Sequence, residues 1–306
     1  MVGSALVRRL EREDCEILTV SHRELDLTRQ ADTERWIEAE RPDVILLAAA
    51  KVGGIAANAT YPADFLYINM MIAMNVLKAA ADFDVEKVLL LGSSCIYPKF
   101  ASQPIDERSL LTGPLEPTNE AYAIAKIGAL KLAQSYAAQH GMRSVSVMPT
   151  SLYGQNDNFD PYNSHVIPAM LRKMHEAKIG GHDSVSVWGT GEPLREFLHV
   201  DDLADACCFL MKHNTHLSLI NIGSGQEISI RNLAYLVADI VGYRKQIVFD
   251  TSKPDGTYRK LLNSSRLENL GWKPKVDLRS GIEDLYGRWL RETAAEASAN
   301  QAHESA

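Results

Sequence analysis

The sequence predicts an α/β protein built on a parallel β-sheet, because short apolar runs alternate with helical patterns through its first half. The apolar runs are residues 17–20, 44–48, 88–91 and 145–148. The helical patterns are at about residues 4–13, 31–40, 63–83 and 118–139. Uninterrupted apolar runs of this length are typical of strands that helices cover on both faces. The expected fold is therefore a doubly wound (Rossmann) parallel sheet, which binds its ligand at the carboxyl ends of the strands.

The beginning of the chain lacks the first strand and the glycine-rich turn with which a doubly wound fold starts. Met1-Val2-Gly3 leads directly into the first helical pattern. Gly3 is in the place of the last glycine of a G-x-x-G-x-x-G turn, the one that allows the first helix to pack closely on the sheet. We expect the first strand and most of the Gly-rich turn, roughly a dozen residues, to be absent from this chain. Two neighbouring strands would then lack a partner. The alternative is a genuine start at Met1 and a fold that begins differently.

The second half of the chain predicts further strands and helices, which are shared between the Rossmann domain and a smaller α/β substrate domain. Strands are expected at residues 195–200 and 219–222, and helices at 230–241, 264–270 and 280–293. Asp201 or Asp202 is expected to cap the helix after the first of these strands.

The expected domains are discontinuous in sequence. Residues 1–150 and about 196–223 are assigned to a Rossmann domain, residues 151–195 and 224–293 to the substrate domain, and residues 294–306 to a disordered tail. The last segment is assigned to a tail because its residues are small, polar and charged.

Composition excludes several classes of protein. The 306 residues carry a net charge of −7 with no basic block, which argues against nucleic acid or an anionic membrane surface as a partner. No apolar run approaches the ~20 residues that cross a bilayer, and the start does not resemble a signal peptide. Cys15, Cys95, Cys207 and Cys208 form no CxxC pair and no zinc spacing. We expect no metal, free thiols and a cytoplasmic location.

Tyr122 and Lys126 form the strongest chemical signal, because a spacing of four places both on one face of a helix. A lysine ammonium near a phenol favours the phenolate and lowers its pKa from ~10 toward neutrality. The tyrosine could then exchange a proton with a carbonyl or alcohol oxygen. The same lysine could hydrogen-bond a nicotinamide ribose. Taken alone, this spacing also fits an amphipathic helix with a core tyrosine and a solvated lysine.

Ser93 follows the apolar run 88–91 directly, where a doubly wound sheet places its ligand. Its hydroxyl could donate to a substrate carbonyl and share a hydrogen bond with the Tyr122 oxygen. The alternative is a serine-rich turn that only closes the strand.

These residues carry a resemblance to a known family. The strand that ends in Ser93, with Tyr122-x-x-x-Lys126, resembles the short-chain dehydrogenase/reductase superfamily. Residues 195–202, REFLHVDD, resemble the strand-to-helix signature of its extended, sugar-nucleotide branch. Within that branch the sequence resembles the GDP-L-fucose synthases from Met1 to about Trp289. The segments that carry this likeness are 49–55 (AAKVGGI), 92–99 (GSSCIYPK), 163–169 (NSHVIPA), 253–257 (KPDGT) and Arg259-Lys260.

The resemblance implies an NADP-dependent epimerase/reductase that converts GDP-4-keto-6-deoxy-D-mannose to GDP-L-fucose. C3 and C5 would be epimerised and the C4 ketone reduced with NADPH. The ketone acidifies both neighbouring carbons, and Cys95 and His165 would be the acid/base pair that inverts them. Ser93 and Tyr122 would hold the C4 oxygen, and Lys126 the cofactor ribose. Without the resemblance, Cys95 would be a small buried residue and His165 an ordinary residue at a helix start.

NADP(H) is the expected cofactor. His22 and Arg23 follow the second strand, where NAD-preferring folds usually have an acidic residue, and basic residues favour a 2′-phosphate. An exposed turn is the alternative. The residues expected to bind the cofactor are Met1, Val2, Gly3, His22, Arg23, Asp26, Leu27, Leu91, Gly92, Ser93, Ser94, Lys126, Pro149, Thr150, Ser151, Leu152 and His165.

For the GDP-sugar, the resemblance implies contacts at Lys173, Trp188, Arg195 and Asn263. Cationic side chains suit a diphosphate, and a tryptophan can pack on the nucleotide sugar. Asn263 stands where the family has aspartate, so a charge is lost there. The family further implies a homodimer through the helices at 63–83 and 118–139.

Two other functions remain open on sequence alone. One is another NAD(P)-dependent nucleotide-sugar epimerase/reductase, such as a 4-epimerase that keeps its NAD bound. Cys95, His165 and the basic turn argue against this function. The other is an N-terminally truncated, inactive form that acts only through dimer contacts.

Overall fold

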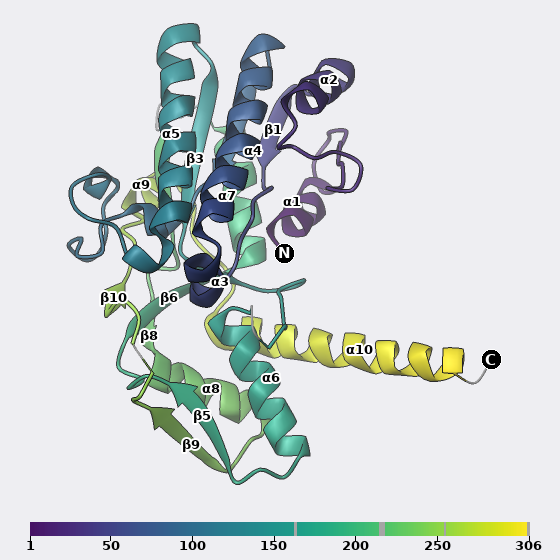
Figure 1. Ribbon diagram of the computed structural model, residues 1–306, viewed down its shortest axis with the longest axis vertical. Coiled ribbons are helices and arrows are strands. Elements are labelled where there is room, and N and C mark those ends of the chain that lie inside the picture. The colour runs from purple at the N-terminus through teal and green to yellow at the C-terminus, as the bar shows by residue number, and fades with distance from the viewer. Residues whose placement is uncertain (162–163, 214–217, 254, 305–306) are drawn as a thin grey trace.

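The computed structural model describes residues 1–161, 164–213, 218–253 and 255–304, with the backbone alone for residues 55–56 and 296–304. Figure 1 shows two units: a sheet between helices that carries the N-terminus, and a smaller unit from which α10 (Leu278–Glu304) projects. Among the helices in these ranges, none is long and apolar enough to cross a membrane.

The larger unit contains a fully parallel sheet. Its strands are β1 (Val44–Leu47), β2 (Lys87–Leu91), β3 (Arg143–Pro149) and β7 (Leu219–Ile222), in the order β1-β2-β3-β7. Parallel neighbours require crossover connections, which the helices provide. The predicted α/β, doubly wound class is confirmed.

Different helices cover the two faces of this sheet. One side has α1 (Val2–Leu10) and α7 (Val200–Lys212), and the other has α2 (Gln30–Glu40), α4 (Pro62–Asp82) and α5 (Glu120–His140). Leu89 packs with the first pair, whereas Val88 and Leu90 pack with the other three. The alternation follows from the period of two along a strand. Both faces are apolar, which explains the uninterrupted apolar runs in the sequence.

The expected strand at residues 17–20 does not join the sheet. In the described part of the chain it has no strand partner, and β1 forms the sheet edge. Leu18 is 38% exposed and Val44 39%. The expected absence of a first strand stays a prediction.

The smaller unit combines short sheets with helices. In one sheet, β6 (Leu194–His199) pairs with β4 (Ser151–Tyr153), β8 (Glu227–Ser229) and β10 (Arg259–Lys260). In a second sheet, β5 (Ser184–Trp188) pairs with β9 (Gln246–Asp250). Its core joins Leu171 of α6 (Val166–Ile179), Leu233 of α8 (Ile230–Val241) and Ile282 of α10. The remaining short helices are α3 (Ile55–Thr60), α9 (Ser265–Asn269), η1 (Ser94–Ile96), η2 (Glu107–Ser109) and η3 (Pro117–Asn119).

Some helix ends differ from those predicted. His199, rather than Asp201 or Asp202, caps α7, because its ring accepts from the Asp201 N–H at 3.3 Å. Asp202 instead accepts from the N–H groups of Lys275 and Val276.

The expected domain and tail boundaries also differ in part. Leu267 and Trp272 pack in the cluster of the main sheet, although the predicted division assigned them to the substrate domain. The backbone of α10 continues to Glu304 through the segment expected to be a tail, since alanines at 294, 295, 297 and 299 favour a helix. Residues 305–306 lie outside the described residues.

Gly92 generates a prediction about stability. A Cβ built on Gly92 would lie 2.1 Å from Met148 Cε and 3.1 Å from the Val147 carbonyl oxygen. Gly92→Ala should lower the free energy of unfolding by about 1–3 kcal/mol or more, because the core must shift. Urea denaturation measures this loss.

The matched control is Gly287→Ala in α10. Its nearest neighbour is the Arg291 Nη1 atom at 3.5 Å. It should gain roughly 0.5–1 kcal/mol from helix propensity. Equal effects of the two substitutions would contradict the close approach at Gly92.

Candidate active site

The carboxyl end of β2 is the centre of the candidate site. After Leu91, Gly92 and Ser93 lead into η1, and the Ser93 hydroxyl caps it by accepting from the Cys95 N–H at 3.4 Å. Ser94 and Cys95 are both 6% exposed. The tight turn thus buries the Cys95 thiol at the edge where a doubly wound sheet binds its ligand.

Tyr122 and Lys126 approach this edge from the first turns of α5. The Lys126 ammonium donates to the Leu91 carbonyl at 2.8 Å and lies 5.6 Å from the centre of the Tyr122 ring. The same ring makes an edge contact with Phe65 of α4, with centroids 6.2 Å apart. The i, i+4 spacing therefore places the ammonium at the end of β2 with the Tyr122 ring beside it.

Protonation of this pair differs from the expectation. Burial raises the pKa of Tyr122 above its ordinary value, and the neighbouring Cys95 adds to this rise. Burial lowers the pKa of Lys126 to about 8, against an opposing effect of Cys95. The predicted lowering of the Tyr122 pKa by lysine is thus wrong for the ligand-free protein, because loss of solvent dominates for both groups. Tyr122 remains a protonated phenol, which is a proton donor.

Cys95 is a thiol of raised pKa, because its burial outweighs the cations around it. Lys260 has the largest opposing effect on this pKa, followed by the hydrogen bond with Ser93 and by Lys126. Thiolate formation therefore depends on these neighbours.

Lys260 was not among the predicted site residues. Strand β10 pairs with β6 so that Lys260 lies opposite Arg195. Burial lowers the pKa of the Lys260 ammonium, Cys95 opposes this fall, and Arg195 adds to it. Lys260 lines a cavity with Cys95, Lys99 and Glu116, of which the last two form an ion pair of 3.0 Å. Its only signal in the sequence is the Arg259-Lys260 segment of the resemblance.

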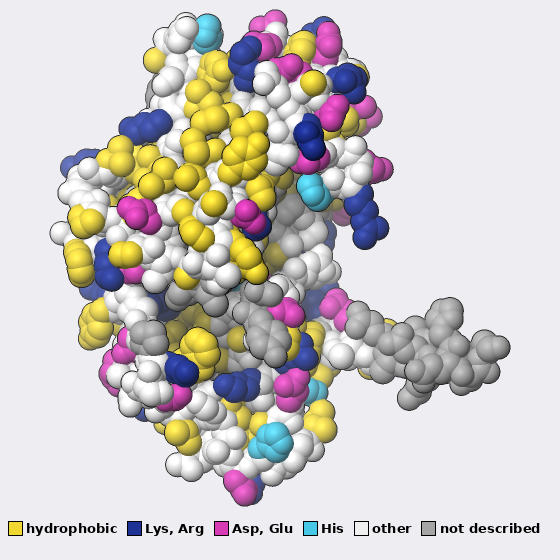
Figure 2. Space-filling view, viewed as in Figure 1, with side chains coloured by type: hydrophobic (Ala, Val, Ile, Leu, Met, Phe, Trp, Pro, Cys, Tyr) yellow, Lys and Arg dark blue, Asp and Glu magenta, His cyan; other side chains and the backbone are white. Residues whose placement is uncertain are grey.

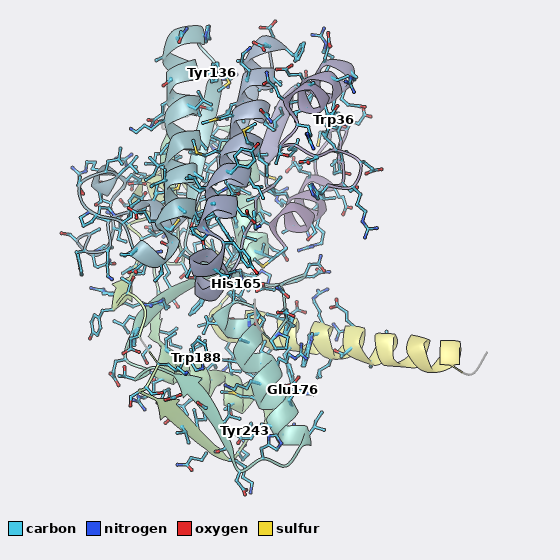
Figure 3. All side chains as sticks on the ribbon, in the orientation of Figure 1. Trp36, Tyr136, His165, Glu176, Trp188 and Tyr243 are labelled. Carbon is cyan, nitrogen blue, oxygen red and sulfur yellow. The ribbon has the colours of Figure 1, made fainter. Side chains whose placement is uncertain are left out.

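His165 stands at the start of α6, where Figure 3 places it between the two units. Its side chain is 47% exposed, and Nδ1 lies 3.5 Å from the Asp157 carboxylate. The hydrogen bond with Asp157 raises the pKa of His165, while burial acts in the opposite direction. The contact of this ring is thus with Asp157, a residue the sequence did not single out.

Three of the expected substrate residues lie in the smaller unit, on α6, β5 and β6. Lys173 Nζ donates to the Ser186 carbonyl at 2.6 Å. Trp188 is 65% exposed, with Lys253 Nζ 5.7 Å from its ring. Arg195 Nη1 donates to the Leu194 carbonyl, and burial lowers the pKa of its guanidinium. Exposed aromatic and cationic groups suit an anionic, planar ligand.

Asn263 has structural partners within the protein. Its side-chain oxygen accepts from the Ser265 N–H at 3.0 Å, and its carbonyl accepts from Asn221. The expected contact of Asn263 with the GDP-sugar stays a prediction.

A small cavity lies at the carboxyl ends of β1 and β2, beside the expected cofactor residues Leu91, Gly92 and Lys126. It is lined by Leu47, Ala49, Asn69, Leu91, Gly92 and Lys126, among others. The Lys126 ammonium in this lining can donate a hydrogen bond to a ribose hydroxyl. Pro149 to Leu152 continue β3 into β4 at the same end of the sheet, and the Thr150 hydroxyl donates to the Glu196 carbonyl at 3.0 Å.

The opposite end of the expected cofactor site is exposed and basic. His22 and Arg23 are exposed, and the Asp26 carboxylate accepts from the N–H and hydroxyl of Thr28. Leu27 offers its carbonyl to Asn75. At the start of α1, a Cβ on Gly3 would meet Ala48 Cβ at 3.9 Å, an ordinary contact, so close packing does not by itself require glycine there. Met1 precedes α1 as its N-cap and Val2 is its first residue.

Glu196 of β6 holds together the segments around Gly225 and Leu262. It is fully buried, and its carboxylate accepts from the Gly225 N–H at 2.8 Å and the Leu262 N–H at 3.0 Å. Burial raises the pKa of Glu196, and these donors oppose the rise. The carboxylate thereby fixes the segments on either side of Arg195 and Lys260. Across the described ranges, no cluster of three or more His, Cys, Asp or Glu side chains suits a metal ion.

These features define a class of protein. Residues 1–223 match the NAD dependent epimerase/dehydratase family. The chain belongs to this family.

Individual relatives resemble the chain over nearly its whole length. The chain is 58% identical to GDP-L-fucose synthase 1 of Arabidopsis thaliana, over 95% of this chain and 90% of the relative. It is 53% identical to GDP-L-fucose synthase of Escherichia coli (strain K12), over 95% of this chain and 94% of the relative. A solved structure of a GDP-L-fucose synthetase from Naegleria fowleri, bound to NADP, superposes with a TM-score of 0.88 at 27% identity, covering 96% of this chain and 92% of that one.

The buried ammonium of Lys126 generates a pH-dependent prediction. Its pKa is about 8 in the folded protein and 10.5 ordinarily, so between these values the unfolded chain binds more protons and stability rises with pH. Relative to Lys126→Met, the wild-type protein should gain roughly 3 kcal/mol over this interval, at about 1.36 kcal/mol per pH unit. Urea denaturation from pH 7 to 10 measures the gain. Lys131→Met, an exposed position on the same helix, is the control. A constant difference between wild type and Lys126→Met would refute the lowered pKa.

Proposed function

We propose that this chain is a GDP-L-fucose synthase. It converts GDP-4-keto-6-deoxy-D-mannose to GDP-L-fucose, by epimerisation at C3 and C5 and then NADPH-dependent reduction at C4. The observation that carries this function is the meeting of Cys95, Tyr122, Lys126 and Lys260 at the end of β2. Likeness to GDP-L-fucose synthases over 95% of the chain supports the same substrate. A 4-epimerase requires neither the thiol nor the basic turn.

In the epimerisation, Cys95 and His165 act as the acid/base pair. The C4 ketone makes the protons on C3 and C5 acidic, so one group removes a proton and the other returns it on the opposite face. Lys260 and Lys126 favour the Cys95 thiolate that removal requires. Asp157 favours the protonated His165 that return requires. Each group is thus matched by a neighbour of opposite charge.

In the reduction, Tyr122 and Ser93 act on the C4 oxygen. NADPH supplies a hydride to C4 when it is bound. The raised pKa keeps the Tyr122 phenol protonated, so it can give its proton to the oxygen that becomes an alkoxide. The Ser93 hydroxyl stabilises the negative charge on that oxygen, as an oxyanion site does. Lys126 would hold the ribose of bound NADPH, and its ammonium places a positive charge beside the phenol.

NADP rather than NAD is favoured by the exposed basic pair His22 and Arg23, whose charge complements a 2′-phosphate. The diphosphate of the GDP-sugar lies toward Arg195 and Lys173 in this proposal, with Trp188 against the nucleotide sugar. The NADP-bound Naegleria fowleri structure supports the cofactor.

The direct test is to incubate the purified chain with GDP-4-keto-6-deoxy-D-mannose and NADPH. We expect NADPH oxidation with formation of GDP-L-fucose. Conversion of substrate without NADPH oxidation would support a different epimerase, and loss of both reactions with folded protein would refute the proposal.

Two substitutions should separate the two half-reactions. Cys95→Ser should slow deuterium exchange at C3 and C5 by about 10²-fold or more, because it removes an acid/base group. Tyr122→Phe should instead slow NADPH oxidation by a similar factor while exchange continues. Mass spectrometry of recovered substrate measures exchange, and absorbance at the nicotinamide band measures reduction. Equal losses of both steps in both variants would contradict these roles.

We further propose a homodimer formed through α4 and α5. Figure 2 shows apolar side chains gathered over these helices, and Tyr67 and Ile124 are 63% and 43% exposed. Four free cysteines, among them the catalytic Cys95, favour a reducing compartment such as the cytoplasm.

Tyr67→Asp tests the dimer. A charge placed in an apolar interface should weaken the free energy of association by about 2–5 kcal/mol and so shift the protein to monomers. Light scattering measures the mass. Tyr235→Asp on α8, a tyrosine with 51% exposure, is the control. A monomeric wild-type protein, or a dimer that Tyr67→Asp leaves intact, would refute this interface.

A further inference from the structure

Asp157 is a buried carboxylate with an unused hydrogen-bonding atom beside the proposed acid/base histidine. Its side chain is 2% exposed. One oxygen, Oδ1, accepts from the Asn158 N–H at 2.8 Å and lies 3.5 Å from His165 Nδ1. The other oxygen, Oδ2, is buried without a hydrogen-bond partner. A buried carboxylate oxygen without a donor is costly, so the presence of this oxygen beside His165 points to a role in that pair.

The turn that carries Asp157 is fixed from two sides. Asn156, at φ 64°, donates from Nδ2 to the Ser4 hydroxyl of α1 at 2.9 Å. Phe159 stacks on Trp289 of α10, with ring centroids 4.9 Å apart and planes 8° from parallel. Arg172 of α6 also donates to the Phe159 carbonyl. Because residues on both flanks are held, the Asp157 carboxylate is kept near the start of α6.

We propose that Asp157 is a positioning residue that orients His165 with its Nδ1–H toward the carboxylate and leaves Nε2 free to exchange a proton with the substrate carbon. An imidazole with Nδ1 protonated and hydrogen-bonded presents its second nitrogen in one defined direction. The 3.5 Å separation is longer than the ~2.8 Å of a tight charged hydrogen bond, a spacing typical of catalytic pairs before substrate closes them. This inference rests on the proposed function and deepens it.

The charge of Asp157 has a second consequence. It raises the pKa of His165, so the ring holds a proton at higher pH than an isolated histidine, while burial opposes this. From α1, the Met1 amino group also faces Asp157, and Arg8 faces that amino group. Removing the carboxylate charge should therefore lower the pKa of His165. The protonated, acid form would then be lost at a lower pH.

The test compares Asp157→Asn with wild type by two measurements. Nuclear magnetic resonance follows the His165 ring against pH in the full ligand-free chain, with the signal identified by its loss in His165→Gln. Mass spectrometry follows deuterium incorporation at C3 and C5 of GDP-4-keto-6-deoxy-D-mannose over the same pH range. We expect the His165 titration and the high-pH limit of exchange to move together to lower pH. Exchange at neutral pH should fall about tenfold or more, with little change in KM.

Asp201→Asn is the matched control, because Asp201 lies 3.9 Å from Nδ1 of His199, a histidine outside the proposed acid/base pair. Asp201→Asn should leave both the His165 titration and the deuterium exchange unchanged. If Asp157→Asn fails to fold, Asp157→Glu and Asp157→Gln provide a pair of equal size that differs in charge. Only Asp157→Glu should retain the raised pKa of His165.

An unchanged His165 titration and exchange profile in folded Asp157→Asn would overturn the role of Asp157 alone. An absence of exchange in wild type would refute the proposed function itself. A lower His165 titration with an unaltered exchange profile would show that His165 is not the proton donor, and would overturn the inference as well.

Discussion

The hydrogen bond from Lys126 to the Leu91 carbonyl is the contact on which the candidate site depends. It joins the helix that carries Tyr122 to the end of the strand that leads to Ser93 and Cys95. The bond forms where both partners are largely removed from water, so it is strong once made and costly to leave unmade. The phenol and the thiol are thereby held at one edge of the sheet by a single ammonium group.

The site is completed by the smaller unit. Lys260 and Arg195 lie opposite one another on paired strands, and the buried carboxylate of Glu196 fixes the segments around them. Because Cys95 follows β2 of the larger unit and Lys260 lies on β10 of the smaller one, the distance between thiol and ammonium is set by packing between the units. A substrate that contacts both units is consistent with this arrangement.

Much of the fold follows from local sequence. Helix α8 begins and ends where predicted, because Ser229 caps its first turn and Gly242 adopts φ 76° after its last. Residues 17–20 have the composition of a strand but no neighbour, since strand formation requires a partner that local sequence does not supply. The helix at 166–179 was not predicted, because Pro168 stands in its first turn, where proline is tolerated.

The site residues also divide into those that local sequence reveals and those that depend on tertiary contacts. Tyr122 and Lys126 are detectable because one helical turn brings them together. The partnership of Cys95 with Lys260 spans more than half of the chain, and it is visible only in the tertiary structure. The Asp157–His165 pair is close in sequence but lies on an irregular turn that no periodicity describes.

The low pKa of the Lys126 ammonium has a consequence for ligand capture. Above about pH 8 part of this group is neutral in the ligand-free protein. A ligand that accepts a hydrogen bond from the charged form draws a proton from solvent as it docks. Heats of association measured in buffers of different ionisation enthalpy then differ, and affinity declines in alkaline solution as that uptake becomes harder.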